Sequence, residues 1–476
     1  MLFNSLEFLL FLPCVLVIYY LLTHRHQNAF LVLASCFFYA SWDWRFLLPL
    51  LFSTTIDYFC AAKISTLIDT NAPIVARKKY LYLSLVTNLG LLAFFKYFNF
   101  FVDSFHDLFL LVKLDLPKPA LRVILPIGIS FYTFQALSYT IDVYRGRLHA
   151  TKSFWDFFLA VLFFPHLVAG PIQRASTLIA QVVEPRKTTR TQVIDGLHLI
   201  MWGFFKKIYI ADRLAPIVNQ VFDLSTPTGG ETLVAVIAFA FQIYCDFSGY
   251  TDIARGVAKL MGFEFMLNFN LPYFATNPPD FWKRWHISLS SWLRDYLYIS
   301  LGGNRGSIVK IYRNLMITMV LGGLWHGAAW NFVIWGFFHG AILIVHRLAI
   351  PILDPVSSYA HALWRAPWLL LRIAGMFVLT CYGWLLFRAT SIEQIVTMTT
   401  SLAQPLARMP IDALRQVLML IAPLIVVQVI QYNSERLEFH RLKWLPKSAC
   451  SAIYALMLYA IVFLGGTPQA FVYFQF

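Results

Sequence analysis

A succession of apolar runs, separated by short polar segments, constrains the fold of this chain more than any other feature. The runs are Glu7–Leu22, Ala29–Trp42, Phe46–Ala62, Tyr80–Val102, Val123–Ile141, Phe154–Pro171, Val193–Ala211, Leu233–Tyr250, Leu315–Trp330, Phe332–Val345, Trp368–Phe387, Val417–Ile430 and Ala449–Gly465. Several are shorter than the roughly 20 residues that a spanning helix needs. Short segments at membrane depth must be covered by protein or by a water-filled cavity, which favours tilted, paired or re-entrant helices.

The composition supports a protein that crosses a membrane many times. Hydrophobic residues make up 59% of the chain and charged residues 13%, whereas a soluble domain carries about 25% charged residues. Within lipid, backbone groups must be satisfied inside each segment, which favours helices. We therefore expect an all-α polytopic membrane protein.

Basic residues predict which loops face the cytoplasm. The positive-inside rule places His24-Arg25-His26 and Arg77-Lys78-Lys79 inside if the chain starts outside. Arg145 and Arg186-Lys187 should also lie inside, although the run Phe154–Pro171 separates them. Either that run is re-entrant or the count of spanning segments is wrong.

The formal net charge of +14 agrees with cytoplasmic loops that lie over anionic lipid. The basic residues are dispersed along the chain and do not form one stripe, so nucleic acid is not an expected partner.

The domain organisation is simple. The N-terminal run has no basic residue before it, contains Glu7 and lacks a small-residue cleavage site, which indicates a retained first helix and not a signal peptide. Internal repeats, low-complexity tracts and separate soluble domains are not visible. We expect one membrane domain over residues 1–476, with residues 271–313 as an amphipathic or re-entrant segment within it.

The cysteines predict neither a disulfide framework nor a zinc site. They lie in or beside apolar runs and include no C-x-x-C pair: Cys14, Cys36, Cys60, Cys245, Cys381 and Cys450. We read them as small buried hydrophobic residues and expect no metal centre.

The motif Trp325-His326-Gly327 lies in a stretch, Asn314–Val345, that contains no Asp, Glu, Lys or Arg. Ionisable side chains at membrane depth are costly and usually face a protein interior or a water-filled cavity, where they often have a function. The alternative is a packing histidine that bonds to neighbouring helices. Polarity alone leaves both interpretations open.

Polar and aromatic residues are interleaved between Leu271 and Arg313. Asn277 followed by Pro278-Pro279-Asp280 is typical of a helix start. From this start the sequence predicts one amphipathic helix, whose apolar stripe is Phe281, Trp285, Leu289, Trp292 and Tyr296. Such a helix could lie in the membrane interface. However, His286 and the sequence Arg294-Asp295-Tyr296 supply more hydrogen-bonding groups than an anchor requires.

Two carboxylates, Asp246 and Asp252, lie six residues apart at the end of an apolar run. This spacing leaves them about 120° away from a common helical face, and Gly249 could bend the chain between them. Buried charges are normally paired, so we favour ion pairs with Arg255 or nearby cations. The alternative is that the acids orient an imidazole or line a polar tunnel.

Five ordered motifs and the last four residues resemble the membrane-bound O-acyltransferases, and within them the bacterial alginate and peptidoglycan O-acetyltransferase branch. The motifs are Pro165-His166-Leu167-Val168-Ala169-Gly170-Pro171-Ile172, Asp246-Phe247-Ser248-Gly249-Tyr250, Phe281-Trp282-Lys283-Arg284-Trp285-His286-Ile287-Ser288, Trp292-Leu293-Arg294-Asp295-Tyr296, Gly322-Gly323-Leu324-Trp325-His326-Gly327 and the closing Tyr473-Phe474-Gln475-Phe476.

The resemblance implies a bundle of about 11–13 spanning and re-entrant helices around a central tunnel. It places the essential histidine at His326 and a supporting histidine at His286, a position where other members have Asn or Asp. The expected substrate-tunnel residues are Trp325, Asp246, Ser248, Tyr250, Trp285, Arg294, Asp295 and Asn331. Burial favours a neutral imidazole, which is a competent general base for attack on an acyl thioester.

The function implied by the resemblance is O-acetylation of an exported or cell-envelope polysaccharide, most simply of the alginate type. Acetyl groups would come from a cytoplasmic donor, acetyl-CoA, with no bound cofactor. The other implied partners are membrane lipid and a separate periplasmic SGNH-type O-acetyltransferase, and the implied location is the bacterial inner membrane, which the chain crosses many times.

Two alternatives remain. One is a D-alanyl or other acyl transferase with a carrier-protein donor, and the other is a non-catalytic lipid or glycan transporter. The sequence names neither the acceptor nor the docking partner, and it does not predict a covalent acyl-enzyme or an oligomeric state. It also leaves His166, His198, His339 and His346 without a role, and we favour structural roles for the last two.

Overall fold

The computed structural model describes residues 1–114, 117, 121–359, 362–404, 409–442 and 444–474. Gln475 and Phe476 of the closing motif lie outside the described residues. The described residues form helices and no strands, so the all-α prediction is confirmed. They divide into two compact units. The assignment of residues 1–476 to a single domain stays a prediction, because compactness does not show whether the units fold separately.

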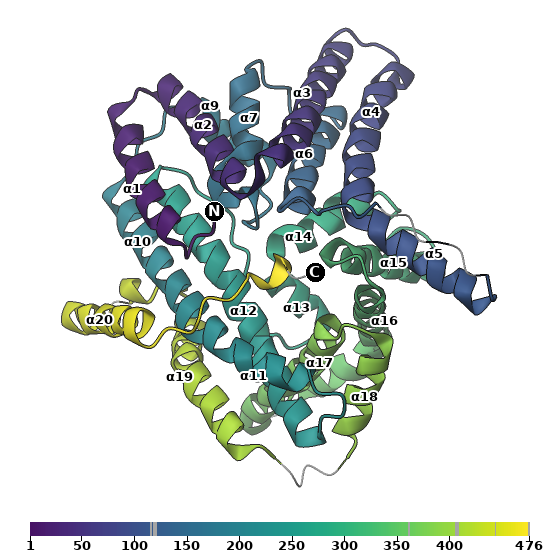
Figure 1. Ribbon diagram of the computed structural model, residues 1–476, viewed down its shortest axis with the longest axis vertical. Coiled ribbons are helices and arrows are strands. Elements are labelled where there is room, and N and C mark those ends of the chain that lie inside the picture. The colour runs from purple at the N-terminus through teal and green to yellow at the C-terminus, as the bar shows by residue number, and fades with distance from the viewer. Residues whose placement is uncertain (115–116, 118–120, 360–361, 405–408, 443, 475–476) are drawn as a thin grey trace. The chain divides into compact units, whose positions relative to one another are not determined.

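Unit 1 comprises Met1–Leu197 and Ala254–Met266. Figure 1 shows its long helices α3 and α4 side by side. Its elements are α1 (Leu6–Leu21), α2 (His24–Asp43), η1 (Trp44–Phe46), α3 (Leu47–Asp69), α4 (Ile74–Leu92), η2 (Ala93–Tyr97), α5 (Phe98–Leu111), α6 (Ile129–Tyr144), α7 (Phe154–Leu162), α8 (Phe164–Leu167), α9 (Ala175–Val183) and the first part of α10 (Arg190–Phe204).

A buried polar network joins three helices of unit 1. The Asp57 carboxylate on α3 accepts hydrogen bonds from Asn88 Nδ2 on α4 at 2.8 Å and from Thr140 Oγ1 on α6 at 3.3 Å. Ser84 Oγ on α4 also donates to it. Polar side chains often link helices in this way inside membrane proteins.

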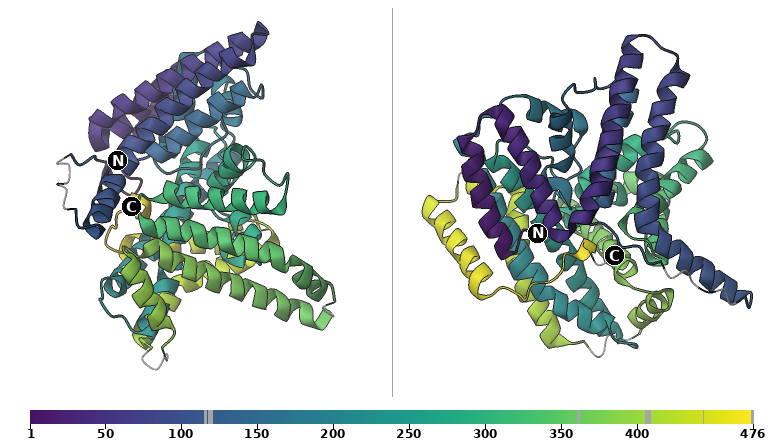
Figure 2. Two further views of the ribbon diagram at one scale, coloured as in Figure 1. Left: turned by 90° about the vertical axis from the view of Figure 1, so that its right-hand side faces the viewer. Right: turned by 45° about the horizontal axis from the view of Figure 1, so that its top comes forward.

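Unit 2 comprises His198–Ile253 and Leu267–Phe476. Figure 2 shows its helices α15, α16 and α17 next to one another. Its elements are η3 (Phe205–Ala211), α11 (Asp212–Phe222), most of α12 (Gly229–Leu260), η4 (Pro272–Phe274), α13 (Pro278–Arg284), α14 (Ile287–Trp292), η5 (Leu293–Tyr298), α15 (Ile308–His326), α16 (Trp330–Tyr359), α17 (Ala362–Arg388), α18 (Ile392–Leu402), α19 (Ile411–Ser434), η7 (Phe439–Arg441), α20 (Lys447–Phe463) and η8 (Val472–Phe474).

Within the described part of the chain, six helical segments are long and apolar enough to cross a membrane: His24–Asp69, Ile74–Leu111, Gly229–Leu260, Trp330–Pro351, Ala366–Arg388 and Ile411–Ser434. Two shorter apolar helices are Leu6–Leu21 and Lys447–Phe463. The polytopic prediction is confirmed. The run Phe154–Pro171 forms only the short helices α7 and α8, which supports the re-entrant alternative for it.

The single helix predicted from Asn277 to Tyr296 is wrong. Its start is confirmed, because the Asn277 side chain accepts a hydrogen bond from the Asp280 amide at 2.8 Å. The helix then ends at Arg284, and His286 has a left-handed backbone with φ of 42°. Asn268 explains the break: its carbonyl accepts from the Ile287 amide, and its Oδ1 accepts from the amide and hydroxyl of Ser288. These long-range bonds replace helical ones.

The predicted apolar stripe is not a membrane-surface stripe. All five of its members are buried: Phe281, Trp285, Leu289, Trp292 and Tyr296. Trp285 is 0% exposed and packs against Trp384 and Phe269, with ring centroids 4.7 and 4.9 Å away. The interpretation of this segment as an interface helix is therefore wrong, because its aromatic face lies in the core of unit 2.

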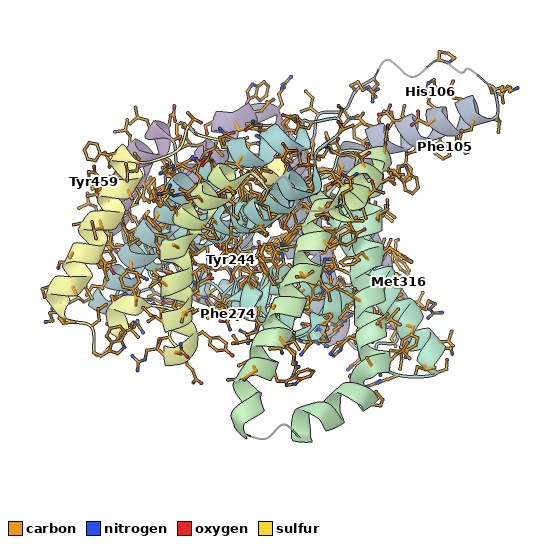
Figure 3. All side chains as sticks on the ribbon, turned by 90° about the horizontal axis from the view of Figure 1, so that it is seen from below. Phe105, His106, Tyr244, Phe274, Met316 and Tyr459 are labelled. Carbon is orange, nitrogen blue, oxygen red and sulfur yellow. The ribbon has the colours of Figure 1, made fainter. Side chains whose placement is uncertain are left out.

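An aromatic core fills unit 2. In Figure 3, Tyr244 on α12 lies among the crowded interior side chains, whereas Tyr459 projects from α20 at the edge. The Tyr244 hydroxyl accepts a hydrogen bond from Gln428 Nε2 on α19 at 2.8 Å. Polar tips of buried aromatic residues usually find such partners. This core supports the residues of the candidate site.

Candidate active site

His326 is the last residue of α15, and the chain turns there before α16 begins at Trp330. Gly327 makes the turn possible, because a Cβ at this position would lie 2.0 Å from the ring of Phe332 on α16. Position 323 likewise has no space for a side chain, because a Cβ on Gly323 would lie 2.1 Å from the backbone oxygen of Phe332. The glycines of the motif therefore allow α16 to pack tightly beside α15.

Four aromatic rings surround the imidazole of His326, which is 5% exposed. Trp325 and Trp335 lie 5.1 and 5.0 Å from it, measured between ring centroids. Phe387 on α17 and Tyr473 near the C-terminus both lie at 5.5 Å. Three helices and the C-terminal segment thus contribute to one closely packed aromatic cluster around His326, which we call the chamber.

His286 lies in the same chamber. Its ring centroid is 6.1 Å from that of His326 and 5.6 Å from that of Trp325. Phe247 on α12 approaches it to 4.7 Å, and Tyr473 to 6.5 Å. The pair of histidines that the sequence predicted is therefore brought together by the fold.

The electrostatic setting keeps His286 neutral. It is 0% exposed and lies outside the six candidate spans. Burial disfavours the charged imidazolium and lowers the pKa of His286 to about 3. At neutral pH this side chain therefore offers one N–H donor and one unprotonated nitrogen.

Asp246 and Asp252 on α12 pair with two consecutive lysines. Lys207 Nζ lies 2.9 Å from Asp246 Oδ1, and Lys206 Nζ lies 2.6 Å from Asp252 Oδ2. Lys206 also donates to the Ser248 hydroxyl at 2.9 Å. The preference for ion pairs with nearby cations is confirmed at these contacts. Gly249 does not interrupt α12, which continues to Leu260.

Three further predicted tunnel residues, Tyr250, Asn331 and Trp285, contact residues that surround the histidine pair. Tyr250 packs on Phe471, with ring centroids 5.2 Å apart. Asn331 Nδ2 donates to the backbone oxygen of Phe387 at 3.1 Å, and so holds a ring that contacts His326. Trp285 supports the neighbouring His286 from the aromatic core.

Arg294 and Asp295 have a different position. Arg294 Nε donates to Asp295 Oδ1 at 2.7 Å, and the Arg294 side chain is 65% exposed. This exposure contrasts with the complete burial of His286. The structure does not bring the Arg294 guanidinium into the chamber of the histidines.

Several residues of the chamber were not among the predicted site residues: Phe247, Trp335, Phe387 and Tyr473, with Lys206, Lys207 and Asp212 behind them. For the lysines a signal existed, because two adjacent cations inside the run Val193–Ala211 require buried acids. Phe247 and Tyr473 lie in motifs that carry the resemblance, whereas Trp335 and Phe387 carried no signal in an aromatic-rich chain.

The other histidines lie elsewhere. His339 on α16 packs between Trp335 and Trp282, with ring centroids 4.6 and 5.0 Å away. His198 Nδ1 and the Tyr454 hydroxyl share a hydrogen bond at 2.9 Å. In unit 1, His166 is buried against Phe265. These are packing environments, and His339 shares the ring of Trp335 with His326.

Residues 145–387 match the membrane-bound O-acyltransferase family, a region that includes both histidines of the pair. The probable alginate O-acetylase AlgI of Azotobacter vinelandii is 44% identical over 394 residues, covering 83% of this chain and 76% of that protein. The peptidoglycan O-acetyltransferase of Helicobacter pylori is 35% identical over 429 residues, covering 83% and 78%. The teichoic acid D-alanyltransferase of Streptococcus thermophilus is 30% identical over 241 residues, covering 46% and 56%.

Proposed function

This chain belongs to the membrane-bound O-acyltransferase family, and we propose that it transfers acetyl groups from a cytoplasmic thioester for O-acetylation of an exported or cell-envelope polysaccharide. The observation that carries the proposal is the pair of buried histidines, His286 and His326, in one aromatic chamber. The names of the relatives support acetyl as the transferred group and an alginate-type polysaccharide as the acceptor.

We assign His326 the role of general base. Its unprotonated nitrogen takes the proton of an acceptor hydroxyl while that oxygen attacks the carbonyl carbon of the acyl thioester. The carbon–sulfur bond then breaks, and the proton passes from the imidazolium to the leaving thiolate. The products are an ester and a free thiol, and the histidine is neutral again. General base catalysis of this kind contributes typically about 10² to 10⁴ in rate.

We assign His286 a supporting role. As a neutral imidazole it has an N–H to donate, either to the oxyanion that forms on the thioester carbonyl or in support of the tautomer of His326. The aromatic rings around both histidines exclude water, which strengthens such a hydrogen bond. The proposal therefore needs both imidazoles.

The donor and the partners complete the proposal. We propose acetyl-CoA as the donor substrate, with no bound cofactor, because the relatives named as O-acetylases transfer acetyl groups. A periplasmic SGNH-type O-acetyltransferase would finish the transfer to the glycan. The bacterial sources of the relatives and the candidate spans support a location in the inner membrane.

The alternatives have less support. The D-alanyltransferase relative covers only 46% of this chain, compared with 83% for the acetylases. A non-catalytic transporter would tolerate replacement of His326 whenever its passage stays open. Four aromatic rings enclose His326, with centroids at 5.0–5.5 Å. A transporter would not need an imidazole in this position, whereas an acyltransferase needs a base.

The test is isotope transfer in membranes. Membranes that contain the wild type or His326→Gln, together with the partner protein, receive acetyl-CoA labelled in the acetyl group. We expect ester-linked label in the glycan fraction with the wild type, and a loss of about 10² to 10⁴ in rate for the variant. Label at the wild-type rate with His326→Gln would contradict the assignment. No label from either would favour a carrier-protein donor or the transporter.

His346→Gln is a matched control. His346 lies on α16, and the helix rise of 1.5 Å per residue places it about 24 Å from the start of that helix beside His326. We expect this variant to label the glycan like the wild type. A loss in both variants would indicate general damage to the helices and not loss of a base.

A further inference from the structure

We propose that Lys207 and Asp246 are positioning residues that hold residues 464–474, the C-terminal segment, so that Tyr473 stays against the two histidines. Figure 1 shows this segment leaving α20 and crossing α12. The effect on acetyl transfer rests on the proposed function. The docking of the segment does not, and it can be measured separately.

Lys207, Asp212 and Asp246 form a buried charge cluster. Lys207 Nζ lies 2.8 Å from Asp212 Oδ1 and 2.9 Å from Asp246 Oδ1. The side chains of Lys207, Asp212 and Asp246 are 9%, 1% and 2% exposed. One ammonium therefore faces two carboxylates in the interior of unit 2. Buried carboxylates need further hydrogen-bond donors.

The C-terminal segment supplies such a donor and also accepts from the lysine. The Val472 amide donates to Asp246 Oδ2 at 2.7 Å, and Lys207 Nζ donates to the Gln469 carbonyl at 3.0 Å. Both bonds have a charged partner, which makes them stronger than neutral ones. These two bonds to the buried cluster exist only while the segment is docked.

Close packing fixes the start of the segment. The Gly466 amide donates to the Ile208 carbonyl at 3.0 Å, one residue after Lys207. A Cβ on Gly466 would lie 2.7 Å from the backbone carbon of Asp212, and one on Gly465 would lie 2.7 Å from Ile208 Cγ2. The two glycines let the chain pass directly over η3 and the start of α11, which carry Lys207 and Asp212.

The next residue after the anchored amide is Tyr473. Its ring centroid lies 4.5 Å from Phe247, 5.5 Å from His326 and 6.5 Å from His286. Phe471, on the other side of the anchor, lies 5.2 Å from Tyr250. A displacement of Val472 therefore moves both rings, and it opens the chamber at the histidine pair.

Lys206 offers an internal control. It precedes Lys207 in the same π-helical turn, η3, and it also pairs with a carboxylate on α12, Asp252, at 2.6 Å. Its own bonds run to Asp252 and Ser248, whereas those of Lys207 include the Gln469 carbonyl. Removal of Lys206 costs a buried ion pair without removing an anchor of the segment.

The experiment measures the docking of the segment through a cysteine. Val472→Cys is close in size to the native side chain, which is 2% exposed, and keeps the backbone amide. We expect this cysteine to resist a water-soluble maleimide in the detergent-solubilised chain. Addition of Lys207→Met should raise its labelling rate by about 10-fold or more. The chain without Val472→Cys gives the background from the native cysteines.

Two further variants make the result decisive. With Lys206→Met we expect the labelling rate of the Val472→Cys chain to stay within about twofold. Lys207→Met leaves two buried carboxylates without a cation, so Lys207→Met/Asp212→Asn/Asp246→Asn keeps the measurement possible if the single variant does not fold. Equal labelling with Lys206→Met and Lys207→Met, or protection in both Lys207 variants, would overturn the proposal.

Acetyl transfer supplies a second readout. We expect Lys207→Met to lower kcat while Lys207→Arg, which keeps the charge, restores most of it. If neither the wild type nor the variants transfer acetyl groups, the proposed function fails, but the labelling result still decides whether the cluster anchors the segment.

Discussion

His286 and His326 approach each other with ring centroids 6.1 Å apart, and each stands at a break in a helix. His286 lies between α13 and α14 with a left-handed backbone, and His326 is the last residue of α15. The pair therefore depends on interruptions of regular structure and not on a face of one helix. Such positions are rigid only when surrounding contacts hold them, which the aromatic chamber does here.

The left-handed backbone of His286 makes a specific prediction for His286→Asn. Asparagine tolerates φ near 42° better than most residues and keeps an N–H donor. We expect transfer to fall only about 10-fold in this variant, and by about 10² to 10³ in His286→Leu, which has no donor. Initial rates of acetyl transfer at matched protein amounts provide the measurement. Equal losses in both variants would show that the donor is not what matters.

Stability should depend on pH through His286. The unfolded imidazole binds a proton below its ordinary pKa of 6.5, whereas burial lowers the pKa of folded His286 to about 3. Between these values the unfolded state binds more protons, so stability falls as the pH falls from 6.5 toward 3 and is fully present above 6.5.

The measurement compares thermal unfolding of the purified chain at about pH 7.5 and about pH 4.5. We expect the wild type to lose more stability on acidification than His286→Asn, which has no titrating group at this position. The difference between the two proteins isolates His286 from the other buried histidines. An identical pH dependence in both would mean that His286 is not held neutral.

Much of the site could be predicted from the sequence because single residues marked it. A histidine in a charge-free stretch made His326 a candidate, to which the resemblance gave a role, and an Asn-Pro-Pro-Asp start identified the cap of α13. The break at His286 could not be predicted, because it depends on hydrogen bonds to Asn268, which is distant in the chain. The spacing of apolar residues predicts local helical structure only, and it carries no information on hydrogen bonds to residues elsewhere in the chain.

The same limit explains the partners of the acids on α12. Spacing showed that Asp246 and Asp252 point to different sides of a helix, but not which cations reach them. Lys206 and Lys207 both do so, from the π-helical segment η3. Tertiary contact, not local propensity, selected these partners.

The variant Arg294→Ala tests whether Arg294 belongs to the substrate tunnel, as the resemblance implied. Its side chain is 65% exposed and pairs with Asp295, and exposed ion pairs contribute about 0–1 kcal/mol. We expect Arg294→Ala to change the thermal stability little and to lower the transfer rate less than about twofold. A large loss of transfer in a stable protein would instead show that Arg294 binds substrate, as the family motif suggested.

The glycines before and after His326 should respond differently to a change in Phe332. A Cβ on Gly327 would lie 2.0 Å from the Phe332 ring, whereas a Cβ on Gly323 would lie 2.1 Å from its backbone oxygen. We expect Gly327→Ala and Gly323→Ala each to destabilise the chain by about 1–3 kcal/mol or more. Phe332→Ala removes the ring but not the backbone, so it should restore part of the stability of Gly327→Ala and none of that of Gly323→Ala. Thermal unfolding of the single and double variants measures this coupling. Rescue of both glycine variants, or of neither, would mean that α15 and α16 do not pack in this register.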